Sequence, residues 1–111
     1  MLVLDINDKI QGDATVAAEV DYTIHGTDNN TPVHLANGQL PDSKGDLFTS
    51  SGKVIISTII LVNTGALANV INLYITEIGG TSRRLIPVDL SLASGAALIF
   101  NINGLSYQIL S

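Results

Sequence analysis

The two histidines, His25 and His34, are the side chains of this chain best suited to proton transfer near neutral pH, because an unperturbed imidazole titrates at about pH 6.5. They stand on either side of the segment Asp28-Asn29-Asn30. A metal site built from both histidines and Asp28 is conceivable, but their spacing matches no established zinc pattern. We therefore interpret both as exposed loop histidines and predict no metal site.

Oxygen-bearing side chains cluster in the same part of the chain and could offer ligands to calcium: Asp28, Asn29, Asn30, Asp42 and Asp46. The spacing of an EF-hand loop is absent, and turn capping is the simpler interpretation. No serine lies in a Gly-x-Ser-x-Gly motif, and Gly79-Gly80 lacks the Gly-Lys-Ser/Thr of a phosphate loop. We predict no catalytic residue, no cofactor and no enzymatic activity.

Arg83 and Arg84 form the only pair of adjacent basic residues. If they lie on a strand, their side chains point to opposite faces. One could be solvated while the other pairs with Glu77 across the Gly79–Ser82 turn, or with an acidic residue of a neighbouring subunit. A structural ion pair is the favoured interpretation over ligand binding.

Composition limits the possible partners. The 111 residues carry a net charge of −5 with five lysines and arginines, and an acidic chain without a basic stripe is a poor candidate for binding nucleic acid. Hydrophobic residues make up 46% and charged residues 14%, against about 25% charged in typical domains. We expect apolar surface to remain after folding and to be covered in a homo-oligomer.

Targeting and redox features are absent from the sequence. No apolar run approaches the roughly 18 residues needed to span a bilayer, and the start lacks the pattern of a secretory signal. We expect no membrane partner. The chain has no cysteine and therefore no disulfide or thiolate chemistry.

The segment Lys53–Ile78 is expected to organise the fold as a hairpin of two strands, Lys53–Asn63 and Asn69–Ile78. β-Branched residues dominate the first strand, which suits a buried pleated surface. Strict alternation places Ile55, Ile59 and Leu61 on one of its faces. In the second strand, alternation points Ile71, Leu73 and Ile75 inward and Asn72, Tyr74 and Thr76 outward.

Short strands with turn signals between them cover the rest of the chain. We expect a strand over Ala14–His25, a loop-rich section over Gly26–Gly52, a strand over Arg83–Asp89, and a hairpin centred on Asn103-Gly104. Residues 1–13 could form a short strand or an arm on a neighbour. Seven to eight short strands without a helical period predict one all-β domain, an antiparallel β-sandwich of Greek-key or jelly-roll type.

The order of short motifs resembles that of a group of small structural proteins of tailed phages and prophages. These proteins open with Met-Leu-x-Leu-Asp, as this chain does in Met1–Asp5, and an Asn-Asp-Lys-Ile-Gln segment follows. The likeness covers most of the chain and is weakest over Gly26–Gly52. The later motifs that carry it are Val62-Asn63-Thr64, Asn72–Ile75, Gly79–Arg84, Leu90–Leu98 and Gly104–Leu110.

The resemblance implies a virion component, such as a capsid decoration, neck or tail-associated protein, made in the cytoplasm of a bacterial host. Such β-sandwich parts are commonly trimers that contact other virion proteins. The alternative function is a receptor- or carbohydrate-binding module that uses the Gly26–Gly52 loops. The absence of tryptophan argues against sugar stacking. We expect the interface between subunits to include Ile55, Ile59, Leu61, Tyr74, Arg83 and Arg84.

Overall fold

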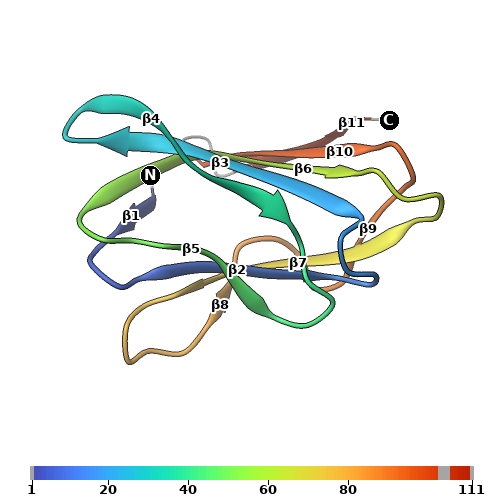
Figure 1. Ribbon diagram of the computed structural model, residues 1–111, viewed down its shortest axis with the longest axis horizontal. Coiled ribbons are helices and arrows are strands. Elements are labelled where there is room, and N and C mark those ends of the chain that lie inside the picture. Colours follow the sequence, from blue (N-terminus) through green and yellow to red (C-terminus); the bar gives the residue numbers. More distant parts are fainter. Residues whose placement is uncertain (1, 103–105, 111) are drawn as a thin grey trace.

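A computed structural model describes residues 2–102 and 106–110 of the chain (Figure 1). These residues form eleven strands, and no helix is present among them. The strands are β1 (Leu2–Leu4), β2 (Lys9–Ala14), β3 (Val20–Asp28), β4 (Thr31–Gln39), β5 (Gly45–Thr49), β6 (Val54–Asn63), β7 (Asn69–Thr76), β8 (Arg83–Arg84), β9 (Leu90–Leu92), β10 (Ala97–Asn101) and β11 (Ser106–Leu110).

The strands form two antiparallel sheets, which lie as two layers in Figure 1. Sheet A has the order β11-β10-β6-β3-β4, and β1 pairs with the end of β6 beside β10. Sheet B has the order β5-β2-β7-β8, with β9 also on β7. The prediction of an antiparallel β-sandwich is confirmed.

The core lies between the two layers and is aliphatic. Its largest fully buried side chains come from both sheets, so neither sheet is stable without the other to cover its apolar face. Tyr22 and Phe100 add aromatic rings to this core, and the Tyr22 hydroxyl donates to the carbonyl oxygen of Leu47 at 3.0 Å. Burial raises the pKa of this phenol above its usual value. The fully buried side chains are Leu4, Ile10, Ile24, Leu40, Ile56, Ile59, Leu61, Ile71, Leu73, Leu92, Leu98 and Ile102.

The predicted hairpin over Lys53–Ile78 is wrong, because β6 and β7 belong to different sheets. The residues between them cross from one layer to the other, and a buried Asn63 holds this crossing. Its Nδ2 donates to the carbonyl oxygens of Leu67 and Leu92, each at 2.9 Å. The glycine-containing connector 64–68 fitted a hairpin loop equally well, so the sequence did not separate a turn within one sheet from a crossing between two.

The predicted faces of β6 are wrong beyond its midpoint. His25 pairs with Thr58 whereas Gly26 pairs with Ile56, so Ser57 is an extra residue and the alternation shifts by one. Gly26 permits this approach, since a Cβ there would lie 2.0 Å from the carbonyl oxygen of Ile55. As a result Ile59 and Leu61 point into the core, while Ile60 and Val62 point outward.

The chain between Ala14 and Gly52 also departs from prediction. The expected strand Ala14–His25 is interrupted at residues 15–19 and resumes as β3 at Val20. The section Gly26–Gly52 is mostly strand: β3 and β4 meet at a two-residue turn, where Asn29 and Asn30 have φ values of 52° and 63°. Asparagine tolerates this left-handed conformation, which matches the twist of a hairpin.

Near the C-terminus the predictions hold in part. The strand expected over Arg83–Asp89 is limited to β8, which has two residues. Strands β10 and β11 pair antiparallel as a hairpin, although the Asn103-Gly104 turn lies outside the described residues. Of the two forms expected near the N-terminus, a short strand or an arm on a neighbour, the structure has the short strand: β1 pairs with β6 of the same chain.

Candidate functional site

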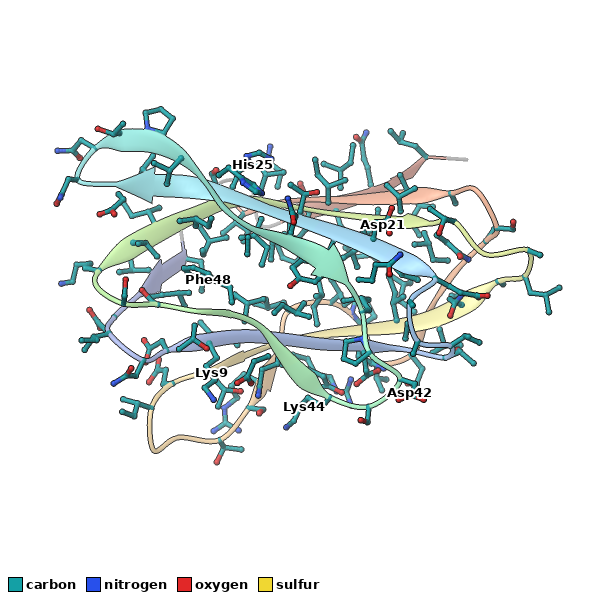
Figure 2. All side chains as sticks on the ribbon, viewed as in Figure 1. Lys9, Asp21, His25, Asp42, Lys44 and Phe48 are labelled. Atoms are coloured by element: carbon teal, nitrogen blue, oxygen red, sulfur yellow. The ribbon has the colours of Figure 1, made fainter. Side chains whose placement is uncertain are left out.

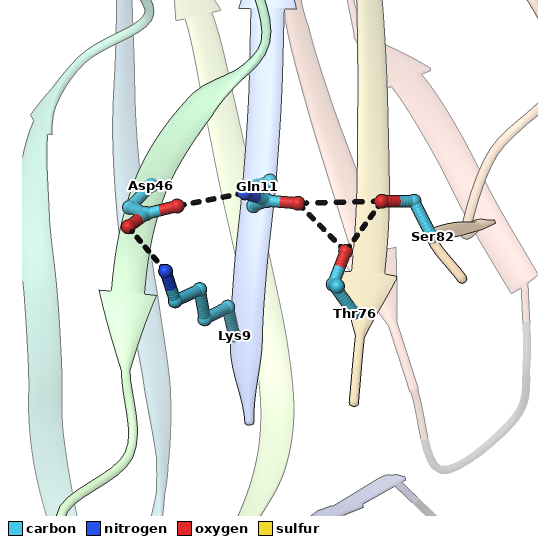
Figure 3. Close-up of polar contacts among 5 residues, drawn as sticks. All are labelled: Lys9, Gln11, Asp46, Thr76 and Ser82. Atoms are coloured by element: carbon cyan, nitrogen blue, oxygen red, sulfur yellow. Dashed lines mark hydrogen bonds and ion pairs between the residues drawn. The ribbon is translucent and has the colours of Figure 1, made fainter. Parts of the chain in front are cut away.

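The outer face of sheet B carries a polar network made by Lys9, Gln11, Asp46, Thr76 and Ser82 (Figure 3). The Lys9 ammonium contacts Asp46 Oδ2 at 2.9 Å, and Gln11 Nε2 donates to Asp46 Oδ1 at 2.7 Å. Thr76 Oγ1 donates to Gln11 Oε1 at 2.6 Å. Three neighbouring strands, β5, β2 and β7, are joined by these side chains across the sheet.

The pKa of Asp46 is determined mainly by its two side-chain hydrogen bonds. The hydrogen bonds from Lys9 and Gln11 lower the pKa of the Asp46 carboxyl, because both bind the ionised form. A carboxylate held ionised in this way is a poor general acid or base at neutral pH. The network links three neighbouring strands through side-chain contacts.

Tyr74 of β7 is the cross-strand partner of Gln11 on β2 and of Arg84 on β8. Lys44 Nζ and Arg84 Cζ each lie 5.1 Å from the centre of the Tyr74 ring, within the range of cation–π attraction. Burial, together with the nearby Asp13 carboxylate, raises the pKa of the Tyr74 phenol. The ring is therefore covered by cations of the same chain.

Asn72, on the same face, is buried beneath these groups. Its Nδ2 donates to Asp13 Oδ1 at 2.9 Å and to Asp89 Oδ1 at 3.1 Å. Its Oδ1 accepts from Arg84 Nη1 at 2.6 Å and from the backbone N–H of Asp89 at 2.9 Å. All of its hydrogen-bonding capacity is used within the chain, so the residue fixes the position of Arg84 and Asp89.

A hollow of about 530 Å³ adjoins the polar network at the loop after β7. Its walls include Lys9, Gln11, Thr76 and Glu77 together with the backbone of Gly79 and Gly80. Lys9 is already paired with Asp46.

The two histidines do come together, on the outer face of sheet A. His25 and His34 are cross-strand partners, and their ring centres are 5.5 Å apart. Both are exposed, and Figure 2 shows His25 on the outer side of the upper layer. Across residues 2–102 and 106–110, no three His, Cys, Asp or Glu side chains gather as metal ligands, whereas a closed zinc site uses four.

The outer face of sheet A differs from that of sheet B because its centre is apolar. Outward positions of β6, β10 and β11 are neighbours there: Val62 pairs with Ala97, and Ile60 pairs with Ile99. Leu110 continues the row beyond Ala97 and is 50% exposed. We call this group the apolar strip; it consists of Ile60, Val62, Ala97, Ile99 and Leu110.

Polar side chains flank the apolar strip along β3 and β4. Asp21 and Thr23 are the β3 partners of Val62 and Ile60, and Gln39 Nε2 donates to Asp21 Oδ1 at 3.0 Å. On the other side of the register shift at Ser57, Val3 of β1 pairs with Ile55 of β6, and both side chains point outward. They form a second apolar area on the outer face of sheet A. An apolar centre with a polar edge is the usual composition of a protein interface.

The residues expected at an interface do not gather on one surface. Ile55 lies on the outer face of sheet A, half-buried beside Val3. Ile59 and Leu61 are 0% exposed, so their assignment to an interface is wrong, because the extra residue Ser57 turns them into the core. Tyr74 and Arg84 lie on sheet B, on the opposite side of the sandwich.

Arg83 is exposed on β8. Within the described residues neither Arg83 nor Arg84 forms an ion pair with Glu77, so of the two expected pairings the one across the turn is not found. The other, with an acidic residue of a neighbouring subunit, stays a prediction.

Sequence reasoning missed Ile60 as an outward apolar residue, whereas the alternation along Ala96–Asn101, with Leu98 and Phe100 inward, leaves Ile99 outward, as the structure has it. The sign in the sequence of the shift that turns Ile60 outward is Gly26, because glycine within a strand often marks a bulge.

Comparison of the chain with models of known protein families, with curated proteins and with solved structures finds no match. The part of the chain that the structure describes contains no helix long and apolar enough to cross a membrane.

Proposed function

We propose that this protein is a non-enzymatic structural protein that assembles with copies of itself through the outer face of sheet A. The observation that carries the proposal is the apolar strip, which a single chain leaves partly exposed: Ile60, Val62, Ala97 and Ile99 are half-buried and Leu110 is 50% exposed. Its members are neighbours across three strands, so they form one continuous surface rather than scattered apolar residues.

Self-association would bury this surface at little cost in polar contacts. Removing apolar area from water contributes about 25 cal/mol per Å², and stable interfaces bury roughly 800 Å² on each partner. The flanking Asp21–Gln39 pair could remain at the solvated edge. The outer face of sheet B is a poor alternative, because a partner would have to displace hydrogen bonds that the chain already makes.

The virion role is the more specific part of the proposal, and the resemblance to small phage and prophage proteins supports it. We infer a capsid decoration, neck or tail-associated protein, a trimer in contact with other virion proteins, made in the bacterial cytoplasm and retained in the particle. The alternative of a receptor- or carbohydrate-binding module has less support, because residues 26–52 are mostly strands. Tyr22, Tyr74 and Tyr107 also lie on strands.

The test is the solution mass of three purified proteins by light scattering: the unchanged chain, Ile60→Glu and Val70→Glu. Val70 is a matched control, since it is a β-branched residue on the outer face of sheet B and 38% exposed. We expect an oligomer of the unchanged chain and of Val70→Glu, and a clearly lower mass for Ile60→Glu. Circular dichroism checks that all three fold. A monomeric unchanged chain, or equal masses for both variants, would contradict the proposal.

The virion role needs its own measurement. Mass spectrometry of purified phage particles from the host that encodes this chain should detect it in fixed proportion to the major capsid or tail proteins. Its absence from particles, with the free protein present in the lysate, would contradict a virion role and leave self-assembly untouched.

A further inference from the structure

Strand β11 is the exposed edge of sheet A, and all five of its residues, Ser106–Leu110, are exposed. It pairs with β10 in a regular register without a shift. Its free side therefore presents a straight row of backbone N–H and C=O groups. Such an edge is a template for another strand unless the protein blocks it.

The other edges of the two sheets each carry a feature that hinders pairing. β4 contains Pro32 and a register shift at Leu35, and β5 carries Asp46 and a register shift against β2. β1, β8 and β9 have only two or three residues each. Proline, charge, bulges and short length are the common means by which proteins protect edges. β11 has none of these.

We propose that β11 pairs antiparallel with β11 of a second copy of this chain, about a two-fold axis at Gln108. The inference rests on the proposed function only in that the partner is another copy. The contact itself is made by the backbone edge of β11 and not by the outer face, although Gln108 points to that face beside Ile99.

The strand is self-complementary in this arrangement. A two-fold axis at Gln108 sets Tyr107 opposite Ile109 of the second copy, and the same pair forms again on the other side of the axis. Tyr107 is 38% and Ile109 43% exposed. Aromatic and β-branched residues in direct cross-strand positions stabilise a sheet, so the pairing covers the two apolar side chains that the strand exposes on its inner side.

Charge also favours a second copy as the occupant. The chain has a net charge of −5, so a contact between two copies is most favourable where it brings no acidic side chains together. Ser106–Leu110 contains no charged residue. The strand can therefore meet its own copy without like-charge repulsion.

Charge complementation at Gln108 tests the proposal. The Gln108→Lys and Gln108→Glu variants are each made in the Ile60→Glu background, so that the outer-face contact is already weakened. The starting protein is the Ile60→Glu chain, for which we expect a dimer. Each double variant alone should be monomeric, because like charges meet at the two-fold axis. An equal mixture of the two should restore dimers that contain one chain of each kind.

Gln39→Lys in the same background is the matched control, because Gln39 is an exposed glutamine on β4, the opposite edge of sheet A. It should leave the dimer intact. Ile99→Lys in the Ile60→Glu background serves as a second control: it charges the outer face one strand away from the edge and should leave edge pairing intact.

The proposal is overturned if the Gln108 variants stay dimeric, if Gln39→Lys or Ile99→Lys disrupts the dimer equally, or if the mixture stays monomeric. The outer-face proposal is tested separately. It fails if the Ile60→Glu chain has the same solution mass as the unchanged protein.

Discussion

The outer faces of the two sheets of this sandwich differ in the side chains that they present. On sheet B, charged and polar side chains bond to one another across the strands: Asp46 to Gln11, Gln11 to Thr76, and Asn72 to Arg84. On sheet A, the corresponding central positions hold Ile60, Val62 and Ile99. The polar side chains of one face are bonded within the chain, whereas the other face has apolar side chains that a second copy would cover under our proposal. The proposal therefore expects the outer face of sheet B, and not that of sheet A, to stay in contact with solvent.

The largest loss of stability is expected for a substitution on the core-facing side of β6. It tests which residues of β6 face the core. Ile59→Ala should lower the free energy of unfolding by about 2–5 kcal/mol, because it leaves a cavity at a fully buried position. Ile60→Ala, one residue along and pointing outward, should cost less than half as much. Urea unfolding at low protein concentration measures both. Equal costs, or the reverse order, would mean that β6 does not shift register at Ser57.

The next largest loss of stability is expected at Asn72, whose amide is buried on the outer face of sheet B. Asn72→Ala should lower the free energy of unfolding by about 1–3 kcal/mol, because Arg84, Asp13 and Asp89 lose their shared partner. Asn37→Ala, the same change at an exposed position of sheet A, should stay within about 0.5 kcal/mol of the unchanged protein. If Asn72→Ala lowers the free energy of unfolding as little as Asn37→Ala does, the hydrogen bonds of Asn72 do not stabilise the outer face of sheet B, and the difference between the two faces is contradicted.

The smallest effect is a pH dependence of the polar network. Lys9 and Gln11 lower the pKa of Asp46 in the folded chain, so the stabilisation is present above the ordinary aspartate pKa of about 3.9 and is lost as the pH falls through the lower folded value. Because the pair is exposed, its contribution is small. The stability difference between the unchanged chain and Asp46→Asn should therefore narrow on acidification.

Asp42→Asn, at an exposed aspartate between β4 and β5, is the control for that experiment. Its stability difference from the unchanged chain should vary less between pH 6 and pH 3 than that of Asp46→Asn. A difference for Asp46→Asn that does not change with pH would show that the contacts drawn in Figure 3 do not stabilise the fold.

The fold class could be predicted from the sequence because it depends on local signals. Alternating β-branched residues in β6 and β7 and turn residues between the strands indicate short strands. The alternation in β7 also gave the right faces, since Ile71 and Leu73 are buried and Tyr74 lies outside.

The interface assignments failed because they depended on non-local facts. The shift that buries Ile59 arises where Gly26 of β3 meets β6, thirty residues along the chain. Likewise, nothing in 64–68 shows that the chain leaves one sheet for the other, because that depends on which strands pair. Strict alternation extrapolated past a bulge reverses every later residue.

The most direct test of the central claim, that the outer face of sheet A and not that of sheet B receives another copy, is carbene footprinting of the unchanged protein at increasing concentration. As the mass rises, labelling of Ile60 and Ile99 should fall, while labelling of Val70 stays constant. A rise in mass with Ile60 and Ile99 still fully labelled, or with Val70 protected in their place, would contradict the account.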